Sequence, residues 1–192
     1  MKIEPTLLRD VLILTPARFG DERGWFSEVF NAARMVAAGL PMVWVQDNHS
    51  MSARAGTLRG LHFQTPPHAQ DKLVRCSRGA ILDVAVDIRV GSPTYGKWLG
   101  VELTAENRRQ LLVPKGFLHG FVTRAPESEV QYKCSDLYAP ECDGAIRWND
   151  PDIGIDWGLN EDWGMGEPVL SAKDAAAPFL RDFASPFTWS AA

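Results

Sequence analysis

Short stretches in which apolar and polar residues alternate, the pattern of β-strands, follow one another from Val43 onward. They predict strands at 43–48, 58–64, 72–76, 81–89, 98–103, 110–113, 117–123 and 130–134. Turn-forming residues separate these strands, at Ala55-Gly56, Pro66-Pro67, Arg78-Gly79, Gly91-Ser92-Pro93 and Ala125-Pro126. Many short strands at this spacing indicate an all-β fold, either a sandwich or a closed barrel.

The alternation is clearest in the segment 81–89. One of its faces is apolar and consists of Leu82, Val84, Val86 and Ile88. The opposite face carries Asp83, Ala85, Asp87 and Arg89. If the chain reverses in a hairpin at 77–80, Lys72 falls on the same face as Asp83 or Ala85, because side chains alternate with period 2. This register allows a Lys72–Asp83 ion pair inside the barrel.

The N-terminal part mixes strand and helix signals. Residues 11–14 are a short apolar strand, and residues 23–30 alternate with aromatic side chains on both faces. A strand with two aromatic faces needs cover on both sides, which a partner subunit could provide. Asn31 as N-cap and Gly39 after the last turn predict a short helix. Near the other end, the segment 171–174 resembles a capping box and predicts a second short helix.

Composition and charge narrow the class of protein. The 192 residues, 45% of them hydrophobic and 23% charged, fit one globular domain over 1–192. The net charge of -4 at pH 7 argues against a nucleic-acid binder, which needs a basic face. Cys76, Cys134 and Cys142 are too few for a disulfide framework. The sequence has no signal-peptide pattern and no membrane-span window, so we expect a cytoplasmic protein without membrane contact.

Charged side chains interrupt the strand signal between 57 and 72, at Arg59, His62, His68 and Lys72. Strict alternation would put Arg59 and His62 on opposite faces, but Gly60 between them predicts a β-bulge that lets both reach one pocket. A second segment, PKGFLHGF at 114–121, contributes His119. We expect the two segments to face each other across the barrel interior and form one site, with His68 at the surface.

Two histidine segments on a β-barrel also raise the question of a cupin-like metal site. Such a site needs two or three histidines and a carboxylate. Here Gln64 stands where a second histidine would be needed, no glutamate follows nearby, and Lys72 comes instead. We therefore expect no metal, and an iron-dependent cupin oxygenase stays as an alternative that elemental analysis would test.

Without a metal, these side chains suit proton transfer at a carbon next to a ketone. That chemistry needs a base with a pKa near 7, a cation or donor for the enolate oxygen, and an acid. His62 is the natural base, Lys72 with His119 would hold the enolate, and Tyr132 would return the proton from the opposite face, which inverts the carbon. Three of the candidate residues also have a purely structural interpretation. His62 would be a hydrogen-bonded strand residue, Tyr132 a residue of the hydrophobic core, and Arg59 a surface ion-pair partner.

Several motifs, taken together and in this order, resemble the dTDP-4-dehydrorhamnose 3,5-epimerase family. They are DERGWFSE, QDNHSMS, GTLRGLHFQTPPHAQDKLVRC, GAILDVAVDIRVGSPTYGKW, PKGFLHGF, YKCSDLYAPECDGAIRWNDPDIGIDW and LSAKDAAAP, within 18–178. The resemblance implies a double-stranded β-helix, that is a jelly-roll (cupin-like) barrel with a few short helices, which needs no cofactor and is usually a homodimer. It also implies the activity: inversion of C3 and C5 of dTDP-4-dehydro-6-deoxy-D-glucose to give dTDP-4-dehydro-L-rhamnose, in deoxysugar synthesis.

Carried over residue by residue, the resemblance implies that His62 is the base, Asp174 orients it, Lys72 stabilises the enolate and Tyr132 is the acid. It implies substrate contacts from Arg23, Phe26, Glu28, Gln46, Asn48, Arg59, His119 and Tyr138. The N-terminal segment, about 1–30, would cross to the partner subunit, with Phe26 on the thymine and Arg23 on phosphate. A helical tail would occupy about 171–192.

The chain departs from the family pattern at three places. Cys142-Asp143 replaces a more polar pair, Leu118 stands where a small residue is usual, and the loop 160–166 is longer than typical. None of these removes an expected catalytic residue. Two alternatives stay open: a mono-epimerase that inverts only C3 or C5 in a natural-product sugar pathway, and a silent cupin that only binds a nucleotide sugar.

Overall fold

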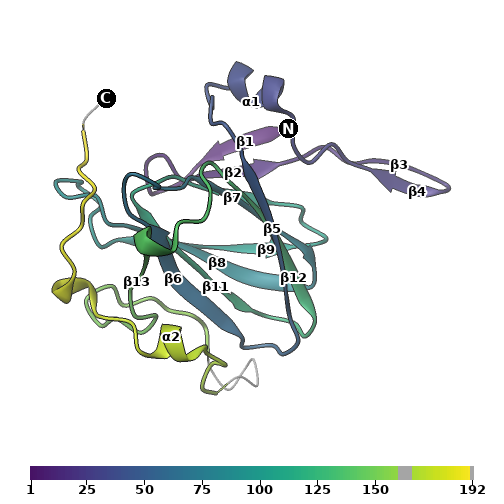
Figure 1. Ribbon diagram of the computed structural model, residues 1–192. Coiled ribbons are helices and arrows are strands. Elements are labelled where there is room, and N and C mark those ends of the chain that lie inside the picture. The colour runs from purple at the N-terminus through teal and green to yellow at the C-terminus, as the bar shows by residue number, and fades with distance from the viewer. Residues whose placement is uncertain (160–165, 191–192) are drawn as a thin grey trace.

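Two antiparallel β-sheets face each other in the computed structural model, which describes residues 1–159 and 166–190 (Figure 1). The six-stranded sheet consists, in spatial order, of β1 (Lys2–Pro5), β2 (Leu12–Thr15), β10 (Gln110–Val113), β7 (Lys72–Arg78), β12 (Ser128–Cys134) and β5 (Gln46–Ser52). The five-stranded sheet consists of β13 (Asp143–Ala145), β6 (Leu58–Gln64), β11 (Phe117–Thr123), β8 (Ala80–Asp87) and β9 (Trp98–Thr104). This arrangement confirms the predicted all-β jelly roll.

Two short helices complete the fold. In α1 (Ala32–Ala37) the Asn31 side chain caps the first turn by accepting from the Arg34 amide. At its end, Gly39 has a φ of 78° and donates to Val36, as the C′ glycine of a Schellman motif does. In α2 (Ala172–Ala175) Ser171 accepts from the Asp174 amide. Both predicted short helices are confirmed, and short 3₁₀ helices lie at Pro140–Cys142 and Leu180–Asp182. The helical tail expected at about 171–192 is wrong, because α2 ends at Ala175 and the described residues up to 190 add only the second of these 3₁₀ turns.

Strand ends match the sequence pattern unevenly. The strands β6, β10 and β11 have the predicted bounds. The strand expected at 43–48 is shifted toward the C-terminus as β5, and β1 and β13 were not predicted at all. The strand expected at 23–30 is only a short arm, in which β3 (Phe19–Asp21) pairs with β4 (Gly24–Phe26). The unusual loop at 160–166 lies almost wholly outside the described residues.

The hairpin predicted between 72–76 and 81–89 is wrong. At Gly79 the chain crosses from one sheet to the other, so β7 pairs with β10 and β12, whereas β8 pairs with β11 and β9. The Lys72–Asp83 ion pair that the hairpin suggested is also wrong, because Asp83 bonds to His119 instead. Local alternation identified both strands correctly but carried no information about which strands pair.

Three apolar clusters hold the layers together. One lies between the sheets and includes Val74, Ala85 and Leu111, with Tyr132 packed against it. The second covers the outer face of the five-stranded sheet with the C-terminal segment, which contributes residues such as Trp157. The third packs α1 on the outer face of the six-stranded sheet. Among the described residues, no helix is long and apolar enough to cross a membrane.

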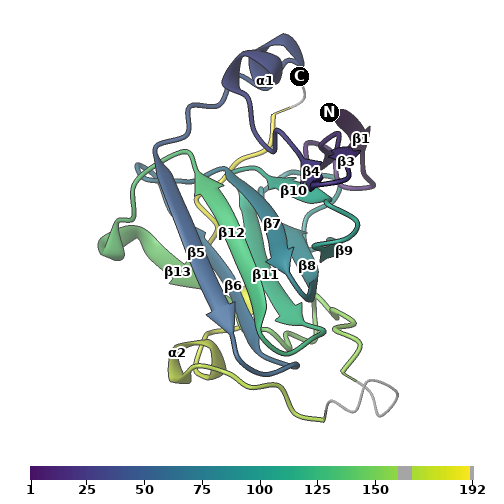
Figure 2. The ribbon, with the colours of Figure 1, turned by 90° about the vertical axis from the view of Figure 1, so that its right-hand side faces the viewer.

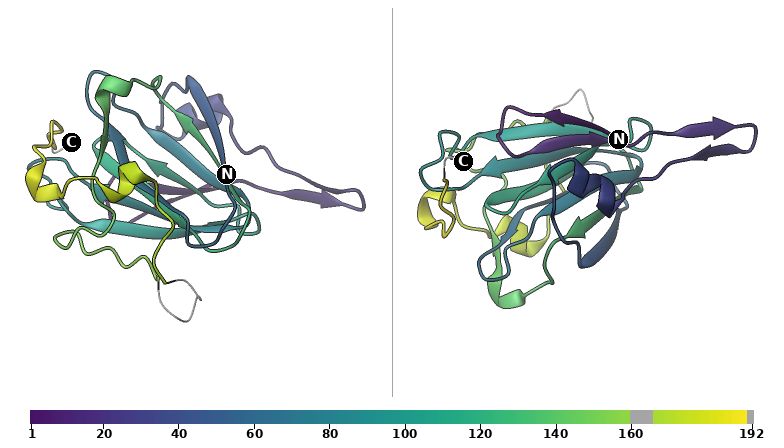
Figure 3. Two further views of the ribbon diagram at one scale, coloured as in Figure 1. Left: turned by 60° about the horizontal axis from the view of Figure 1, so that its bottom comes forward. Right: turned by 90° about the horizontal axis from the view of Figure 1, so that it is seen from above.

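The β3–β4 arm projects away from the body (Figures 1 and 3), and the view along the arm in Figure 2 faces the six-stranded sheet. Its aromatic side chains are largely exposed, 65% for Phe19, 63% for Trp25 and 68% for Phe26. The Arg18 guanidinium lies 4.0 Å from the centroid of the Trp25 ring. Among residues 1–159 and 166–190, only the stacked arginine therefore covers part of these exposed rings.

Candidate active site

Two adjoining cavities between the sheets contain most of the residues expected from the sequence. The first, of about 400 Å³, is lined by Arg59, His62, Lys72, His119, Tyr132 and Asp174, with other residues of β6, β11 and α2. The second, of about 380 Å³, shares His62, Lys72, Tyr132 and Lys173 with the first and adds Gln46, Asn48 and Tyr138. The four shared residues make the two cavities the halves of one site.

A β-bulge in β6 brings Arg59 and His62 to the same cavity. His62 pairs with His119 on β11, but Arg59 pairs with Phe121, so two residues of β6 lie opposite one residue of β11. Gly60 occupies the extra position with a φ of 130°. The bulge reverses the alternation, and the prediction that both side chains face one pocket is confirmed.

His62 and Asp174 form a closely bonded pair although they are far apart in the chain. The His62 Nε2 atom lies 2.6 Å from Asp174 Oδ1, and the carboxylate side chain is only 4% exposed. Burial alone would raise the pKa of Asp174, but hydrogen bonds from His62, Ser171 and the Gly60 amide lower it below its usual value. A carboxylate only accepts, so Nε2 carries the hydrogen and Nδ1 keeps a lone pair.

Lys72 enters the same cavity from β7, in the opposite sheet. Within the described part of the chain its ammonium makes no hydrogen bond or ion pair. Burial lowers the pKa of Lys72, and the negative charges of Asp143 and Asp83 oppose that shift. An ammonium group held without a protein partner is suited to bind an oxygen that becomes negative during a reaction.

Tyr132 also comes from the six-stranded sheet, on β12, and lines both halves of the site. Burial raises the pKa of its hydroxyl, and the nearby positive charge of Arg59 partly opposes the shift. The phenol therefore stays protonated at neutral pH and can give a proton. Since His62 is on β6 of the facing sheet, the acid and the base approach the cavity from opposite sides.

His119 forms a second histidine–carboxylate pair. Its Nε2 atom lies 2.8 Å from Oδ1 of Asp83, and both side chains are buried. His119 sits beside His62 because the two residues are direct partners in the β6–β11 pairing.

The second half of the site is polar and mostly uncharged. The Gln46 amide donates to Asn48, and the Tyr138 backbone amide donates to Gln46 Oε1. The Tyr138 hydroxyl donates to Asp143, which also pairs with Lys173. These contacts place the expected residues Gln46, Asn48 and Tyr138 together along one wall.

Three expected substrate-binding residues lie away from these cavities within the chain. Arg23 pairs with Asp21 at 2.6 Å inside the arm, and Phe26 is exposed beside it. Glu28 binds Arg34 and Asn31 near the start of α1.

The structure adds site residues that the sequence reasoning missed. Lys173 lines both halves and pairs with Asp143 in the second, and Ser50, Gln70 and Phe121 are among the other lining residues. Lys173 directly precedes Asp174, so its position next to an expected catalytic residue was the available signal. Asp143 lies on the unpredicted strand β13, whose short sequence shows no alternation.

The donor set does not form a metal site. In the described ranges no group of three or more His, Cys, Asp or Glu side chains could hold a metal ion. Each histidine of the cavity has one carboxylate partner. The arrangement instead offers a base, a cation and a protonated phenol around one cavity, which is the set needed for proton exchange at a carbon acid.

Comparison with known proteins places this geometry in a family. The family model described as dTDP-4-dehydrorhamnose 3,5-epimerase matches residues 5–182. The chain is 52% identical to the dTDP-4-dehydrorhamnose 3,5-epimerase of Salmonella typhimurium, over 94% of the chain and 96% of that protein. It is 38% identical to a dTDP-4-dehydrorhamnose 3-epimerase of Streptomyces niveus, over 95% of the chain and 85% of that protein.

Solved structures agree with these relatives. A crystal structure of a dTDP-6-deoxy-D-glucose-3,5-epimerase from Legionella pneumophila, in complex with dTDP-4-keto-L-rhamnose, superposes with a TM-score of 0.92 and 44% identity. That comparison covers 99% of this chain and 99% of the other. The chain therefore belongs to the dTDP-4-dehydrorhamnose 3,5-epimerase family.

Proposed function

We propose that this site inverts C3 and C5 of dTDP-4-dehydro-6-deoxy-D-glucose and so produces dTDP-4-dehydro-L-rhamnose. The chain is an isomerase of the 3,5-epimerase type, by its family and its relatives. The observation that carries the assignment of roles is the placement of the His62–Asp174 pair and Tyr132 in one cavity, on facing sheets. Inversion needs this separation, because the proton must leave one face of the carbon and return to the other.

The reaction begins at His62. Its Nδ1 lone pair takes the proton from C3 or C5, each of which is next to the C4 ketone and therefore acidic. The electron pair of the broken C–H bond moves into the ring, and the ketone oxygen becomes an enolate oxygen. Asp174 holds the imidazole ring during this step and stabilises the positive charge that forms on it.

The enolate oxygen is bound by Lys72. Its ammonium is available because it has no partner among the described side chains. Tyr132 then gives a proton to the opposite face of the same carbon, and both groups recover their original protonation from solvent. Both carbons are adjacent to the same ketone, so one base, one acid and one cation serve two successive inversions.

The nucleotide would lie along the second half of the site. Arg59 lines the first half, where its guanidinium donates to the Ser52 hydroxyl and the Met51 carbonyl, and it would bind the diphosphate, since a guanidinium matches its oxygens. Gln46, Asn48 and Tyr138 offer hydrogen bonds and an aromatic ring to the base and the sugar of the nucleotide. Several of these side chains are already bonded to one another, which favours a pre-formed site.

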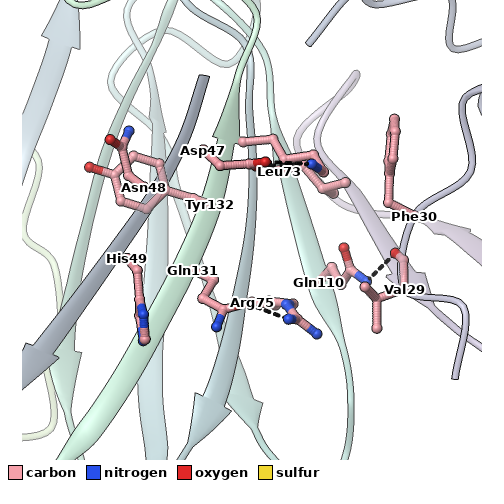
Figure 4. A pocket seen from close by; sticks show the side chains of 11 residues that line it. Val29, Phe30, Asp47, Asn48, His49, Leu73, Arg75, Gln110, Gln131 and Tyr132 are labelled. Carbon is pink, nitrogen blue, oxygen red and sulfur yellow. Dashed lines mark hydrogen bonds and ion pairs between the residues drawn. The ribbon is translucent and has the colours of Figure 1, made fainter. Parts of the chain in front are cut away.

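We further propose a homodimer in which the β3–β4 arm reaches the partner's site; of the segment expected to cross, about 1–30, the strands β1 and β2 stay in the chain's own six-stranded sheet. The arm carries exposed aromatic rings and projects from the outer face of the six-stranded sheet. That face also has a pocket of about 340 Å³ beside Val29, where Arg75, Gln110 and Gln131 turn outward (Figure 4). Packing of a second copy on this face would bring Phe26 and Arg23 to a nucleotide that their own chain cannot reach.

The reaction in deuterated water tests the proposed function. With dTDP-4-dehydro-6-deoxy-D-glucose we expect label and inversion at both C3 and C5, read by NMR. Label at one carbon alone would identify a mono-epimerase. Absence of exchange at both carbons, in a folded protein that binds the nucleotide sugar, would identify a binding protein and contradict the proposal.

A His62→Ala variant tests the assignment of the base. We expect exchange at both carbons to fall by about 100-fold or more, because a positioned base contributes at least that much. Exchange at the wild-type rate would remove His62 from the mechanism.

A further inference from the structure

Asp83 is a buried carboxylate with an unused oxygen. It is 0% exposed on β8, its Oδ1 accepts from His119, and its Oδ2 has no hydrogen-bond partner among the described residues. A buried charge with incomplete hydrogen bonding lowers the stability of the folded state. Asp83 does not line the cavity itself but lies behind His119, which does, so its incompletely bonded charge indicates a role in holding that histidine.

The contact with Asp83 fixes what His119 can do. Because the carboxylate only accepts, the hydrogen of the imidazole ring lies on Nε2. The Nδ1 atom makes no hydrogen bond within the described part of the chain. It is also not fully enclosed, so a ligand can reach it. Since His119 lines the cavity, Nδ1 is available there as a hydrogen-bond acceptor.

We propose that Asp83 is a positioning residue that holds His119 with Nδ1 as an acceptor for a hydroxyl group of the hexose. The inference rests on the proposed function, which puts a hexose with hydroxyl groups at C2 and C3 in this cavity. An acceptor cannot donate to an enolate oxygen, so His119 does not share the role of Lys72 that the sequence suggested. The two histidine–carboxylate pairs then divide the work: His62 moves the proton and His119 orients the ring.

The charge of Asp83 also acts on Lys72, so the pH dependence of kcat provides a second test of the role of Asp83. The groups around Lys72 are Asp83 on β8, Cys134 and Tyr132 on β12, His62 on β6, His119 on β11, Asp143 on β13 and Lys173 on α2. The negative charge of Asp83 is one of the influences that raise the pKa of Lys72 against its burial. Removing that charge lowers the pKa of Lys72, so the protonated form is lost at a lower pH.

Two substitutions of Asp83 test the proposal. Asp83→Leu keeps the branched shape but removes both the acceptor and the charge, and Asp83→Asn removes the charge and keeps one acceptor oxygen. We expect kcat/KM to fall at least about tenfold in Asp83→Leu and less in Asp83→Asn. In both variants the alkaline limb of the kcat profile should move to lower pH, while the midpoint of thermal unfolding stays equal to that of the wild type or rises.

Asp87→Asn is the matched control. Asp87 is equally buried on the same strand, but it accepts hydrogen bonds from Arg89, Ser92 and Thr94 away from the cavity. We expect this variant to lower the midpoint of thermal unfolding and to leave the pH profile unchanged. If Asp83→Asn behaves like Asp87→Asn, less stable with an unchanged profile, Asp83 is structural and the proposal is wrong.

Substrate analogues that lack the C2 or the C3 hydroxyl test the partner of His119. Exchange at C5 can be followed with both analogues. For the analogue that lacks the contacted hydroxyl, Asp83→Leu should cause no further loss relative to the wild-type chain, because the hydrogen bond is already absent. If Asp83→Leu lowers the exchange rate by the same factor with both analogues as with the full substrate, the proposal is wrong. Wild-type protein that exchanges neither C3 nor C5 would instead refute the proposed function itself.

Discussion

The acidity of Asp174 is the residue-level property on which the proposed base depends. A carboxyl group buried without partners would be protonated and could not orient an imidazole. Here hydrogen bonds from His62, Ser171 and Gly60 outweigh the effect of burial, so the carboxylate form persists. Because its pKa in the folded chain is depressed, its contribution to stability is present above the pKa of the unfolded chain and is lost as the pH falls through the lower, folded value.

Replacing Asp174 with Asn tests this dependence. The neutral amide can donate to His62 Nε2 and so favour the wrong tautomer, with the lone pair turned away from the substrate. We expect kcat to fall by about 100-fold or more, with a circular dichroism spectrum like that of the wild type. The exposed Asp152→Asn variant serves as control. Wild-type kcat in Asp174→Asn would show that His62 needs no orienting carboxylate.

Replacing Tyr132 with Phe separates proton removal from proton return. The base and Lys72 remain, so the variant should still exchange substrate protons for deuterium. Without the acid on the facing sheet, we expect inversion to fall by about 100-fold or more while exchange falls much less. NMR measures both rates in one sample, exchange as deuterium incorporated into the substrate and inversion as product formed. Equal loss of both processes would indicate that Tyr132 is not the acid.

At this scale the sequence was informative about residue types and weak about their partners. The chemistry of a carbon acid was enough to select His62, Lys72 and Tyr132 as candidates, and the structure brings the three to one cavity. Asp174 could be assigned only through the family resemblance, since its local pattern indicates the start of a helix. That reading is also correct: its amide donates to Ser171 while its carboxylate binds His62, so one residue serves both purposes.

At the scale of elements, the bulge in β6 is the feature that assembles the site. Gly60 has a φ of 130°, and a Cβ atom there would lie 2.6 Å from the Gly120 Cα atom of the neighbouring strand. Both the backbone conformation and the approach of β11 therefore require glycine. Without the bulge, strand alternation would turn Arg59 and His62 to opposite faces.

Gly60→Ala should accordingly damage both stability and activity. We expect a loss of about 2–4 kcal/mol in the free energy of unfolding, from the strained backbone and the clash together. Urea denaturation measures the loss. Gly91→Ala is the control, because Gly91 also has a positive φ, 85°, but no atom lies within 4 Å of its Cβ position. An equal loss in both variants would mean that the close approach of β11 is unimportant.

Elements were predicted where their pattern is local and missed where it is not. The strands β6, β10 and β11 have clear apolar runs bounded by turns, and their bounds were correct. The edge strands β1 and β13 are short and exist because a neighbouring strand offers hydrogen bonds. The wrong hairpin between β7 and β8 has the same origin, since pairing joins residues distant in the sequence and leaves no local signal.

At the scale of the whole molecule, the proposed site is divided between the cavities and the β3–β4 arm. The cavities contain the proposed base, acid and cation, but the expected nucleotide contacts Arg23 and Phe26 lie on the projecting arm. Sequence patterning predicted aromatic faces that need cover and could not show what covers them. A second copy of the chain would both cover these aromatic side chains and receive Arg23 and Phe26 at its own site. A two-fold axis makes this exchange of arms reciprocal.

Heterodimers made from two inactive chains would test this exchange directly. One chain carries His62→Ala and the other carries Arg23→Ala with Phe26→Ala, and co-expression with different tags allows the mixed dimer to be purified. If each arm serves the partner, one site combines all the substitutions and the other combines none, so the mixed dimer should have about half the activity of the wild-type dimer. If each arm serves its own chain, both sites stay defective and the mixed dimer is inactive. The two geometries thus predict opposite results from the same protein.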